Sequence, residues 1–120
     1  PNMHSIECRI NAEDPEFAFR PTPGEITSLN VPGGQGIRVD SHIFQGYRIP
    51  PFYDSLVAKL ITVAHTRETA ISKMKRALDE YVIEGIKTTI PFHKKMMDNK
   101  DFIAGNIDTK YLERNDWREF

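Results

Sequence analysis

The spacing of the apolar residues changes near Thr66, and this change constrains the fold more than any other feature of the sequence. Before Thr66, apolar and polar residues alternate in short runs that are broken by proline and glycine. After Thr66, apolar residues recur at every third or fourth position. A period of two is typical of half-buried strands, and a spacing of three or four is typical of amphipathic helices. The sequence therefore predicts an α+β fold, with most strands in the first half and the helices in the second.

The strand-rich half begins with the segment HSIECRIN. Ile6, Cys8 and Ile10 fall on one side of it and polar residues fall on the other, so we expect a half-buried strand. The run from residue 56 to residue 64 is almost entirely apolar apart from Lys59, as expected for a strand that is covered on both sides. The expected strands after the first are at residues 25–30, 37–40 and 56–64.

The helical half begins at Thr66, a good N-cap residue, and Glu68 follows in the first turn, where the helix dipole favours an acidic side chain. We expect an amphipathic helix of about four turns. Its apolar stripe consists of Ala70, Ile71, Met74, Ala77, Leu78 and Tyr81. A strand-like run with a turn or bulge at Gly85 follows. Three shorter helices are then expected: one from Thr89 to about Met97, one that Asp98 or Asn99 caps and that leads to Phe102, and one at 109–112.

Size and charge exclude several classes of protein. The 120 residues fit a single domain that spans residues 1–120. With 16 basic and 17 acidic residues, the net charge of -1 gives no bulk attraction to nucleic acid or to an anionic membrane. No apolar run approaches the roughly 20 residues that are needed to cross a bilayer. The one cysteine, Cys8, excludes an internal disulfide and fits a cytoplasmic protein.

Several patterns that can bind phosphate or metal have simpler interpretations. The glycine-rich stretch 33–36 suggests a phosphate loop, but the Gly-Lys-Ser/Thr ending is missing, so we interpret it as a turn between strands. The four histidines contain no pair with metal-ligand spacing, so no metal site is predicted. The acidic residues after the first strand can serve in acid–base catalysis, hold magnesium or form an ordinary turn: Glu13, Asp14 and Glu16.

Two arginines lie on predicted strands. An arginine in such a place can pair with the acid two residues away, which is Glu7 for Arg9 and Asp40 for Arg38. A guanidinium group can also grip a carboxylate-like anion with two parallel hydrogen bonds. The residues alone leave both interpretations open.

Tyr53 and Asp54 lie where a stiff Pro50-Pro51 corner enters a predicted strand. Such a corner fixes its side chains well, as a binding site requires. Asp54 can instead accept hydrogen bonds from nearby backbone amides and stabilise the turn. The sequence does not decide between these two roles.

Six stretches, in fixed order, resemble the C-terminal domain of biotin carboxylase, the ATP-dependent component of acetyl-CoA carboxylase and of related carboxylases. They are ECRINAEDP, PTPGEI, PGGQGIRVDSH, GYRIPPFYDSLVAKLI, AISKMKRALDEYVIEGIKTTI and, near the end, YLE. The resemblance covers essentially the whole chain. Its specificity lies in the ordered series and not in any single motif.

The resemblance implies a small β-sandwich or barrel-like portion, of the barrel-sandwich hybrid type, with helices packed against it. It implies a longer protein whose upstream ATP-grasp portion holds ATP and magnesium, and no cofactor bound by this chain alone. Bicarbonate is activated there as carboxyphosphate, and the carboxyl group passes to the N1 nitrogen of biotin. The implied partners are the ATP-grasp portion, a biotin carboxyl carrier protein, a carboxyltransferase component and a second copy of the full-length chain.

Site residues can be carried over where the motifs match. The resemblance implies a catalytic, electrostatic role for Arg9, which faces bicarbonate and biotin in the family. It implies that Tyr53 and Asp54 lie at the biotin pocket. Family members that pair through the C-terminal domain often have an aromatic residue at the position of Gln35, so pairing is expected to be weaker or differently arranged here. The implied subunit interface contains Arg38, Gln35, Lys73 and Glu80.

Two functions follow as alternatives. In the first, the full-length protein is a ligase that carries out the first half-reaction of acetyl-CoA carboxylase in fatty acid biosynthesis, and this fragment alone is inactive. In the second, the domain is chiefly a scaffold or pairing module of a pyruvate, propionyl-CoA or other biotin-dependent carboxylase. The chain enters its first strand within a few residues of Pro1, so we expect a piece of a longer protein.

Overall fold

A three-stranded antiparallel sheet forms the centre of the molecule, with the order β1 (His4–Asn11), β8 (Leu56–Ala64) and β6 (Ile37–Ser41). The computed structural model describes residues 3–51, 54–108 and 110–120, so Tyr53 lies outside the described residues. Within these ranges, six short strands form antiparallel pairs: β2 (Glu13–Asp14) with β3 (Arg20–Pro21), β4 (Gly24–Glu25) with β7 (Arg48–Ile49), and β5 (Ser28–Asn30) with β9 (Val82–Glu84). The helices are α1 (Arg67–Glu80), α2 (Ile90–Asp98), α3 (Lys100–Ile103) and α4 (Tyr111–Arg114), with short 3-10 turns η1 (Pro15–Phe17) and η2 (Trp117–Glu119). The predicted α+β class is confirmed.

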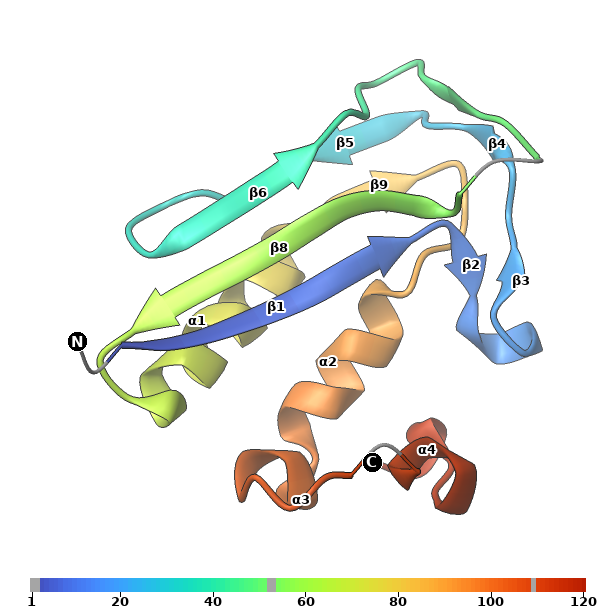
Figure 1. Cartoon of the computed structure of the whole chain (residues 1–120). Helices are drawn as coiled ribbons and strands as arrows, with labels where there is room; N and C mark the ends of the chain where they lie inside the picture. The colour runs from blue at the N-terminus through green and yellow to red at the C-terminus, as the bar shows by residue number, and fades with distance from the viewer. Residues whose placement is uncertain (1–2, 52–53, 109) are drawn as a thin grey trace.

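The helices cover one face of the central sheet. Figure 1 shows α1 behind β1, β8 and β6, with α2 beside α1 and the short C-terminal helices beyond it. The buried residues of β1 alternate as predicted: Ile6, Cys8 and Ile10 point toward the helices and the residues between them are exposed. The stripe of α1 that was expected to be apolar is buried against them, including Met74 and Leu78. Removing side chains of this size from water stabilises the fold by about 1.5–3 kcal/mol each.

Most helix boundaries follow from the expected capping residues. The hydroxyl of Thr66 accepts a hydrogen bond from the amide of Thr69 and begins α1, and the side chain of Asn99 caps α3 in the same way. Thr89 precedes α2, but its side chain makes no capping hydrogen bond to that helix. The last helix begins at Tyr111, later than expected.

Two strand predictions need correction. The strand expected at 25–30 is divided, because its backbone changes partner: the amide of Ile26 donates to the carbonyl of Tyr47, and the amide of Thr27 donates to the carbonyl of Glu84. In β8 only one face is fully buried. On the other face, Lys59, Ile61 and Val63 are half-exposed, because no element of the chain's described part covers that side of the sheet.

The stretch 33–36 forms the predicted turn before β6. Gly36 has φ of +76°, a backbone conformation that side chains rarely adopt. Its carbonyl accepts a hydrogen bond from the amide of Val63 at 2.9 Å, so the turn is held against the end of β8.

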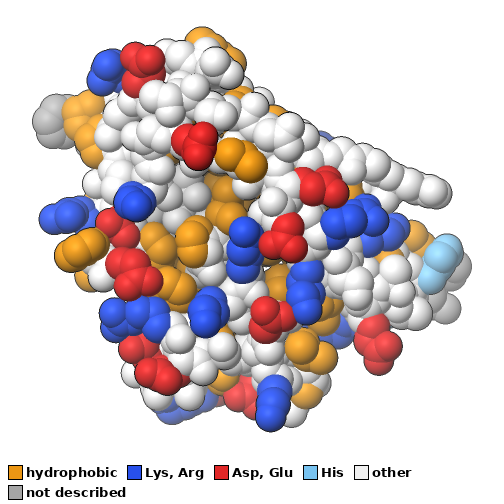
Figure 2. Space-filling model, turned by 180° about the vertical axis from the view of Figure 1, so that it is seen from behind, with side chains coloured by type: hydrophobic (Ala, Val, Ile, Leu, Met, Phe, Trp, Pro, Cys, Tyr) orange, Lys and Arg blue, Asp and Glu red, His pale blue; other side chains and the backbone are white. Residues whose placement is uncertain are grey.

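The polar surface carries both signs of charge. Figure 2 shows lysine and arginine interspersed with aspartate and glutamate over the rear of the molecule. Ion pairs between α1 and α2 contribute to this pattern: Lys75 with Asp98 at 2.7 Å and Lys94 with Asp79 at 3.5 Å. No helix within the described residues is long and apolar enough to span a membrane.

Candidate functional site

The open face of the central sheet brings charged residues from three strands into one row. Arg9 of β1 pairs with Lys59 of β8, and Lys59 pairs with Asp40 of β6. Directly paired residues of an antiparallel sheet project from the same face, with Cβ atoms about 4.5–5.5 Å apart. Across the sheet, the positively charged Arg9 and Lys59 are therefore followed by the negatively charged Asp40.

The two strand arginines differ in their partners. The Nε atom of Arg38 lies 3.0 Å from Oδ1 of Asp40, which is the ion pair that the sequence left as one of two interpretations, and both side chains are exposed. This hydrogen bond raises the pKa of Arg38 above its usual value. Among the described residues, no ion pair joins Arg9 to Glu7 or to any other carboxylate, and none involves Lys59. Arg9 and Lys59 are thus two adjacent cations on an open face.

The backbone at Arg9 is held from outside the sheet. The β1–β8 register shifts between Ile10 and Asn11, one residue beyond Arg9. The carbonyl oxygen of Arg9 accepts hydrogen bonds from Oγ1 of Thr89, at 3.2 Å, and from Nε2 of His93, at 2.8 Å. Burial lowers the pKa of His93, although the hydrogen bond to Arg9 opposes that effect. The imidazole is therefore neutral at pH 7, and its one proton is on Nε2, since a carbonyl oxygen can only accept.

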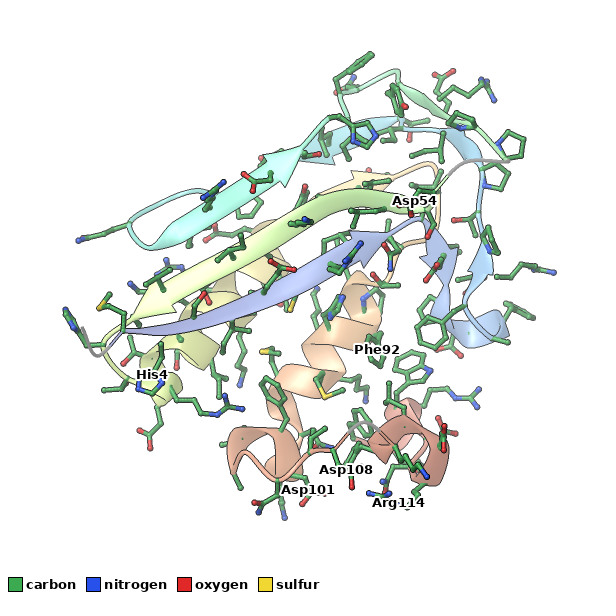
Figure 3. All side chains as sticks on the ribbon, viewed as in Figure 1. His4, Asp54, Phe92, Asp101, Asp108 and Arg114 are labelled. Atoms are coloured by element: carbon green, nitrogen blue, oxygen red, sulfur yellow. The ribbon has the colours of Figure 1, made fainter. Side chains whose placement is uncertain are left out.

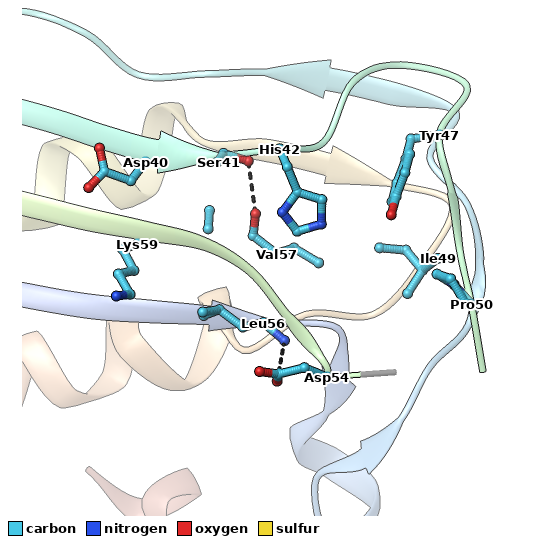
Figure 4. Close-up of a pocket in the computed structure, with 11 residues that line it drawn as sticks. Asp40, Ser41, His42, Tyr47, Ile49, Pro50, Asp54, Leu56, Val57 and Lys59 are labelled. Atoms are coloured by element: carbon cyan, nitrogen blue, oxygen red, sulfur yellow. Dashed lines mark hydrogen bonds between the residues drawn. The ribbon is translucent and has the colours of Figure 1, made fainter. Parts of the chain in front are cut away.

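A cavity of about 750 Å³ opens beside Lys59, at the end of the sheet where β8 begins (Figure 4). Asp54 lies at this end and His4 at the opposite end (Figure 3). Oδ1 of Asp54 accepts a hydrogen bond from the amide of Leu56 at 3.1 Å, so Asp54 both stabilises the turn and lines the cavity. Other lining residues include His42, Tyr47, Ile49, Pro50, Val57 and Lys59.

The residues expected at a subunit interface do not form one cluster. Gln35 is exposed in the turn before β6. Nζ of Lys73 approaches the same turn and donates to the carbonyl of Val63 at 3.1 Å. Glu80 lies at the other end of α1, where it forms an exposed pair with Arg76 at 3.8 Å.

The remaining candidates have structural roles. Oε2 of Glu13 accepts a hydrogen bond from Oγ of Ser55 at 2.7 Å, and Oδ1 of Asp14 accepts one from the amide of Glu16 at 3.0 Å. These bonds support the interpretation of the acidic stretch as a turn. Among the described residues, no group of three His, Cys, Asp or Glu side chains is placed to hold a metal ion. Burial raises the pKa of Cys8 to about 12, which keeps its thiol protonated.

The sequence pointed to Arg9 as a candidate but not to the residues around it. Lys59 had a visible signal, because it is the only charged residue in the apolar run 56–64. Thr89 and His93 had none, since they are about 80 residues away from Arg9 in the sequence. Together these residues present two cations on adjacent strands, neither paired with a carboxylate of the described residues. This arrangement can bind a small anion or stabilise a developing negative charge.

Comparison with known proteins gives consistent matches. The family model described as "Biotin carboxylase C-terminal domain" matches residues 7–114. Biotin carboxylase 1 of Bacillus subtilis (strain 168) is 57% identical over 112 residues, which is 93% of this chain and 25% of that protein. The chain therefore spans about a quarter of the length of the curated relatives that it matches.

Two solved structures have the same fold. A biotin carboxylase from Campylobacter jejuni in complex with β,γ-ATP is 54% identical, with a TM-score of 0.92 over 95% of this chain and 25% of that chain. The biotin carboxylase domain dimer of the Hydrogenobacter thermophilus 2-oxoglutarate carboxylase was solved with MgADP, ADP and bicarbonate. It is 53% identical, with a TM-score of 0.90 over 92% of this chain and 24% of that chain.

Proposed function

This chain belongs to the family of biotin carboxylase C-terminal domains, and we propose that it contributes Arg9 to the active site of a longer, biotin-dependent carboxylase. The observation that carries the proposal is the state of the Arg9 side chain. It is exposed on the open face of the sheet, next to Lys59, and no carboxylate of the described residues pairs with it. A guanidinium group in this state is available to a guest anion.

The proposed role of Arg9 is electrostatic. Bicarbonate is an anion that a guanidinium group can hold with two hydrogen bonds. When biotin loses the proton of N1, negative charge develops on the ureido oxygen, and a cation fixed in advance stabilises that charge. Lys59, directly opposite Arg9, adds a second positive charge to the same field.

The ATP and magnesium sites are assigned to the rest of the longer protein. Among the chain's described residues, no group of three or more His, Cys, Asp or Glu side chains is placed to hold a metal ion. Nucleotide, magnesium and bicarbonate are bound in the related Hydrogenobacter thermophilus structure, which supports their use in the whole enzyme. We propose the same for this protein, with residues 1–120 as its single C-terminal domain.

We propose that biotin binds in the cavity beside Lys59. Asp54 lines this cavity, and Tyr53, outside the described residues, precedes it in the sequence. Apolar side chains such as Ile49 and Val57 suit the C–H groups and the thioether ring of biotin's fused heterocycles. The β-sandwich or barrel-like portion that the family resemblance implies also remains a prediction.

The wider assignments follow from family membership. We propose a cytoplasmic enzyme that pairs as a homodimer and works with a biotin carboxyl carrier protein and a carboxyltransferase component. Acetyl-CoA is the default acceptor, in keeping with a role in fatty acid biosynthesis. Relatives that are a pyruvate carboxylase subunit and a 2-oxoglutarate carboxylase show that this domain occurs with other acceptors as well.

The test is an arginine substitution in the full-length protein that contains this chain. Arg9→Ala should lower the turnover of free biotin by about a hundredfold or more, since removing one preorganised donor to a developing oxyanion has an effect of that size. Arg48→Ala is the matched control, because Arg48 is also an exposed strand arginine but lies outside the row on the open sheet face. Near-normal turnover in Arg9→Ala would rule out the proposed role.

The alternative function is that of a pairing module. It is favoured by Arg38, whose exposed pair with Asp40 lies on the open sheet face and is available to a partner surface. Under this alternative, Arg38→Ala would weaken association and Arg9→Ala would leave turnover unchanged. Sedimentation of both variants, beside the activity assay, separates the two functions.

A further inference from the structure

The outer edge of β1 is covered by the first turn of α2. In the order β1–β8–β6, strand β1 has β8 on one side only, so its other edge presents unpaired backbone groups. Four hydrogen bonds from α2 and the residue before it satisfy this edge between Arg9 and Asn11. The amide of Thr89 donates to the carbonyl of Asn11 at 3.0 Å, and the amide of Asn11 donates to Oγ1 of Thr89 at 3.0 Å.

The other two bonds converge on a single atom. The carbonyl oxygen of Arg9 accepts from Oγ1 of Thr89, at 3.2 Å, and from Nε2 of His93, at 2.8 Å. A carbonyl oxygen has two lone pairs, so both acceptor positions of Arg9 are filled. The two donors therefore hold the peptide group between Arg9 and Ile10 from the outer edge of β1.

The capping pattern of α2 shows that the Thr89 hydroxyl is diverted to this edge. A threonine before a helix normally accepts a hydrogen bond from the helix amides. Thr89 makes no such bond and is 3% exposed. Its hydroxyl accepts from one residue of β1 and donates to another, on either side of the register shift at Ile10. Register shifts of this kind re-aim a side chain next to functional sites.

The helix that carries the donors is itself fixed. Ile90 and Met97 of α2 are buried in the core. Phe92 packs edge-on against Phe19, with ring centroids 5.3 Å apart, and against Trp117 at 5.9 Å. Packing on both sides of His93 therefore sets where its imidazole can reach.

We propose that Thr89 and His93 are positioning residues for Arg9, which fix its backbone so that the guanidinium is presented to the reacting anion. The inference rests on the proposed function of Arg9. A displacement of about 1 Å in a catalytic group can lower turnover by about a hundredfold. Loss of the contact to the Arg9 carbonyl should therefore act on catalysis more than on folding.

The first test uses two amides at position 93 in the full-length protein. The amide nitrogen of glutamine can occupy the place of Nε2, whereas the asparagine side chain is one methylene group shorter and does not reach the Arg9 carbonyl. We expect His93→Asn to lower kcat/KM for bicarbonate, with free biotin as acceptor, by about tenfold or more, and we expect His93→Gln to retain most of it. His65→Asn, at an exposed histidine, is the control for the substitution itself.

The second test asks whether His93 acts through Arg9. In an Arg9→Ala background, His93→Asn should cause no further loss of kcat/KM, because the side chain that it positions is already absent. Thr89→Val and Thr89→Ser give an independent pair, of which only serine keeps the hydroxyl. Melting temperatures of all variants report whether a loss of activity is only a loss of folded protein.

The outcomes separate the two proposals. If Arg9→Ala keeps normal turnover, the proposed function itself fails. If Arg9→Ala is inactive but His93→Asn matches the wild type, only the positioning role fails. Equal loss in His93→Asn and His93→Gln, or an additive loss in the double variant, would also overturn the positioning role. A loss in His93→Asn that glutamine restores and that disappears without Arg9 would establish it.

Discussion

At the scale of single residues, sequence context does not determine what a charged side chain does. Arg9 and Arg38 both lie on strands with an acid two residues away, yet only Arg38 pairs with that acid. Arg9 instead lies opposite Lys59, and like charges in directly opposed positions destabilise a sheet. An anion bound between the two cations would offset this repulsion.

Cys8 provides a prediction about reactivity. Its side chain is 3% exposed and burial raises its pKa to about 12, so at pH 8 roughly one thiol in ten thousand is ionised. We expect iodoacetamide to modify Cys8 at least about a hundredfold more slowly in the native protein than in urea, because the thiolate is the reactive form. Mass spectrometry over a time course measures both rates. Equal rates would show that the first strand does not hold Cys8 in the core.

At the scale of secondary-structure elements, the sequence predicts those whose pattern is uninterrupted. β1, β8 and α1 follow from their periods, because their burial depends on residues within the element. The hairpin of β2 and β3 does not follow. Ala18 and Phe19 have positive φ there, at 55° and 58°, and Phe19 packs against Phe92 and Trp117, more than 70 residues away. A backbone conformation that distant residues stabilise leaves no local signal.

The turn before β6 can be tested with two glycines. At Gly36 a Cβ atom would lie 2.5 Å from Nζ of Lys73 and 2.6 Å from the carbonyl oxygen of Val63, while at Gly33 nothing lies within 4 Å and φ is not positive. Gly36→Ala should therefore lower the free energy of unfolding by about 1–3 kcal/mol. Gly33→Ala should change it by less than about 0.5 kcal/mol.

Urea unfolding followed by circular dichroism measures both changes. If the two alanine variants are equally stable, the left-handed conformation of Gly36 and its close approach to the carbonyl of Val63 are wrong.

At the scale of the whole molecule, the candidate site is assembled from distant segments. Arg9 could be identified from a motif, but Lys59 comes from a strand 50 residues later, and His93 comes from a helix about 80 residues away. Strand order and helix packing decide which of these residues meet, and the sequence around each residue predicts neither. The site is also open on one side, as expected if the other three quarters of the longer protein complete it.

The open face leads to a prediction about subunit pairing. Arg38 and Arg48 both have side chains that are 72% exposed, and each pairs with one carboxylate, at 3.0 and 3.4 Å. Arg38 lies on the central sheet and Arg48 on the separate pair of β4 and β7. If Arg38 lies at the subunit interface, Arg38→Glu in the full-length protein should raise the dissociation constant of the dimer about tenfold or more, because it replaces an attraction across the interface with repulsion.

Arg48→Glu is the matched charge reversal and should leave the dissociation constant unchanged. Sedimentation equilibrium of both variants measures the association, and low salt should enlarge the difference because screening is weaker there. Gln35, in the turn next to β6, offers the opposite change: Gln35→Phe adds apolar area to the same surface and should strengthen pairing. Equal association of the Arg38 and Arg48 variants would show that the subunit interface does not include Arg38. The open sheet face would then serve only the proposed binding of an anion by Arg9 and Lys59.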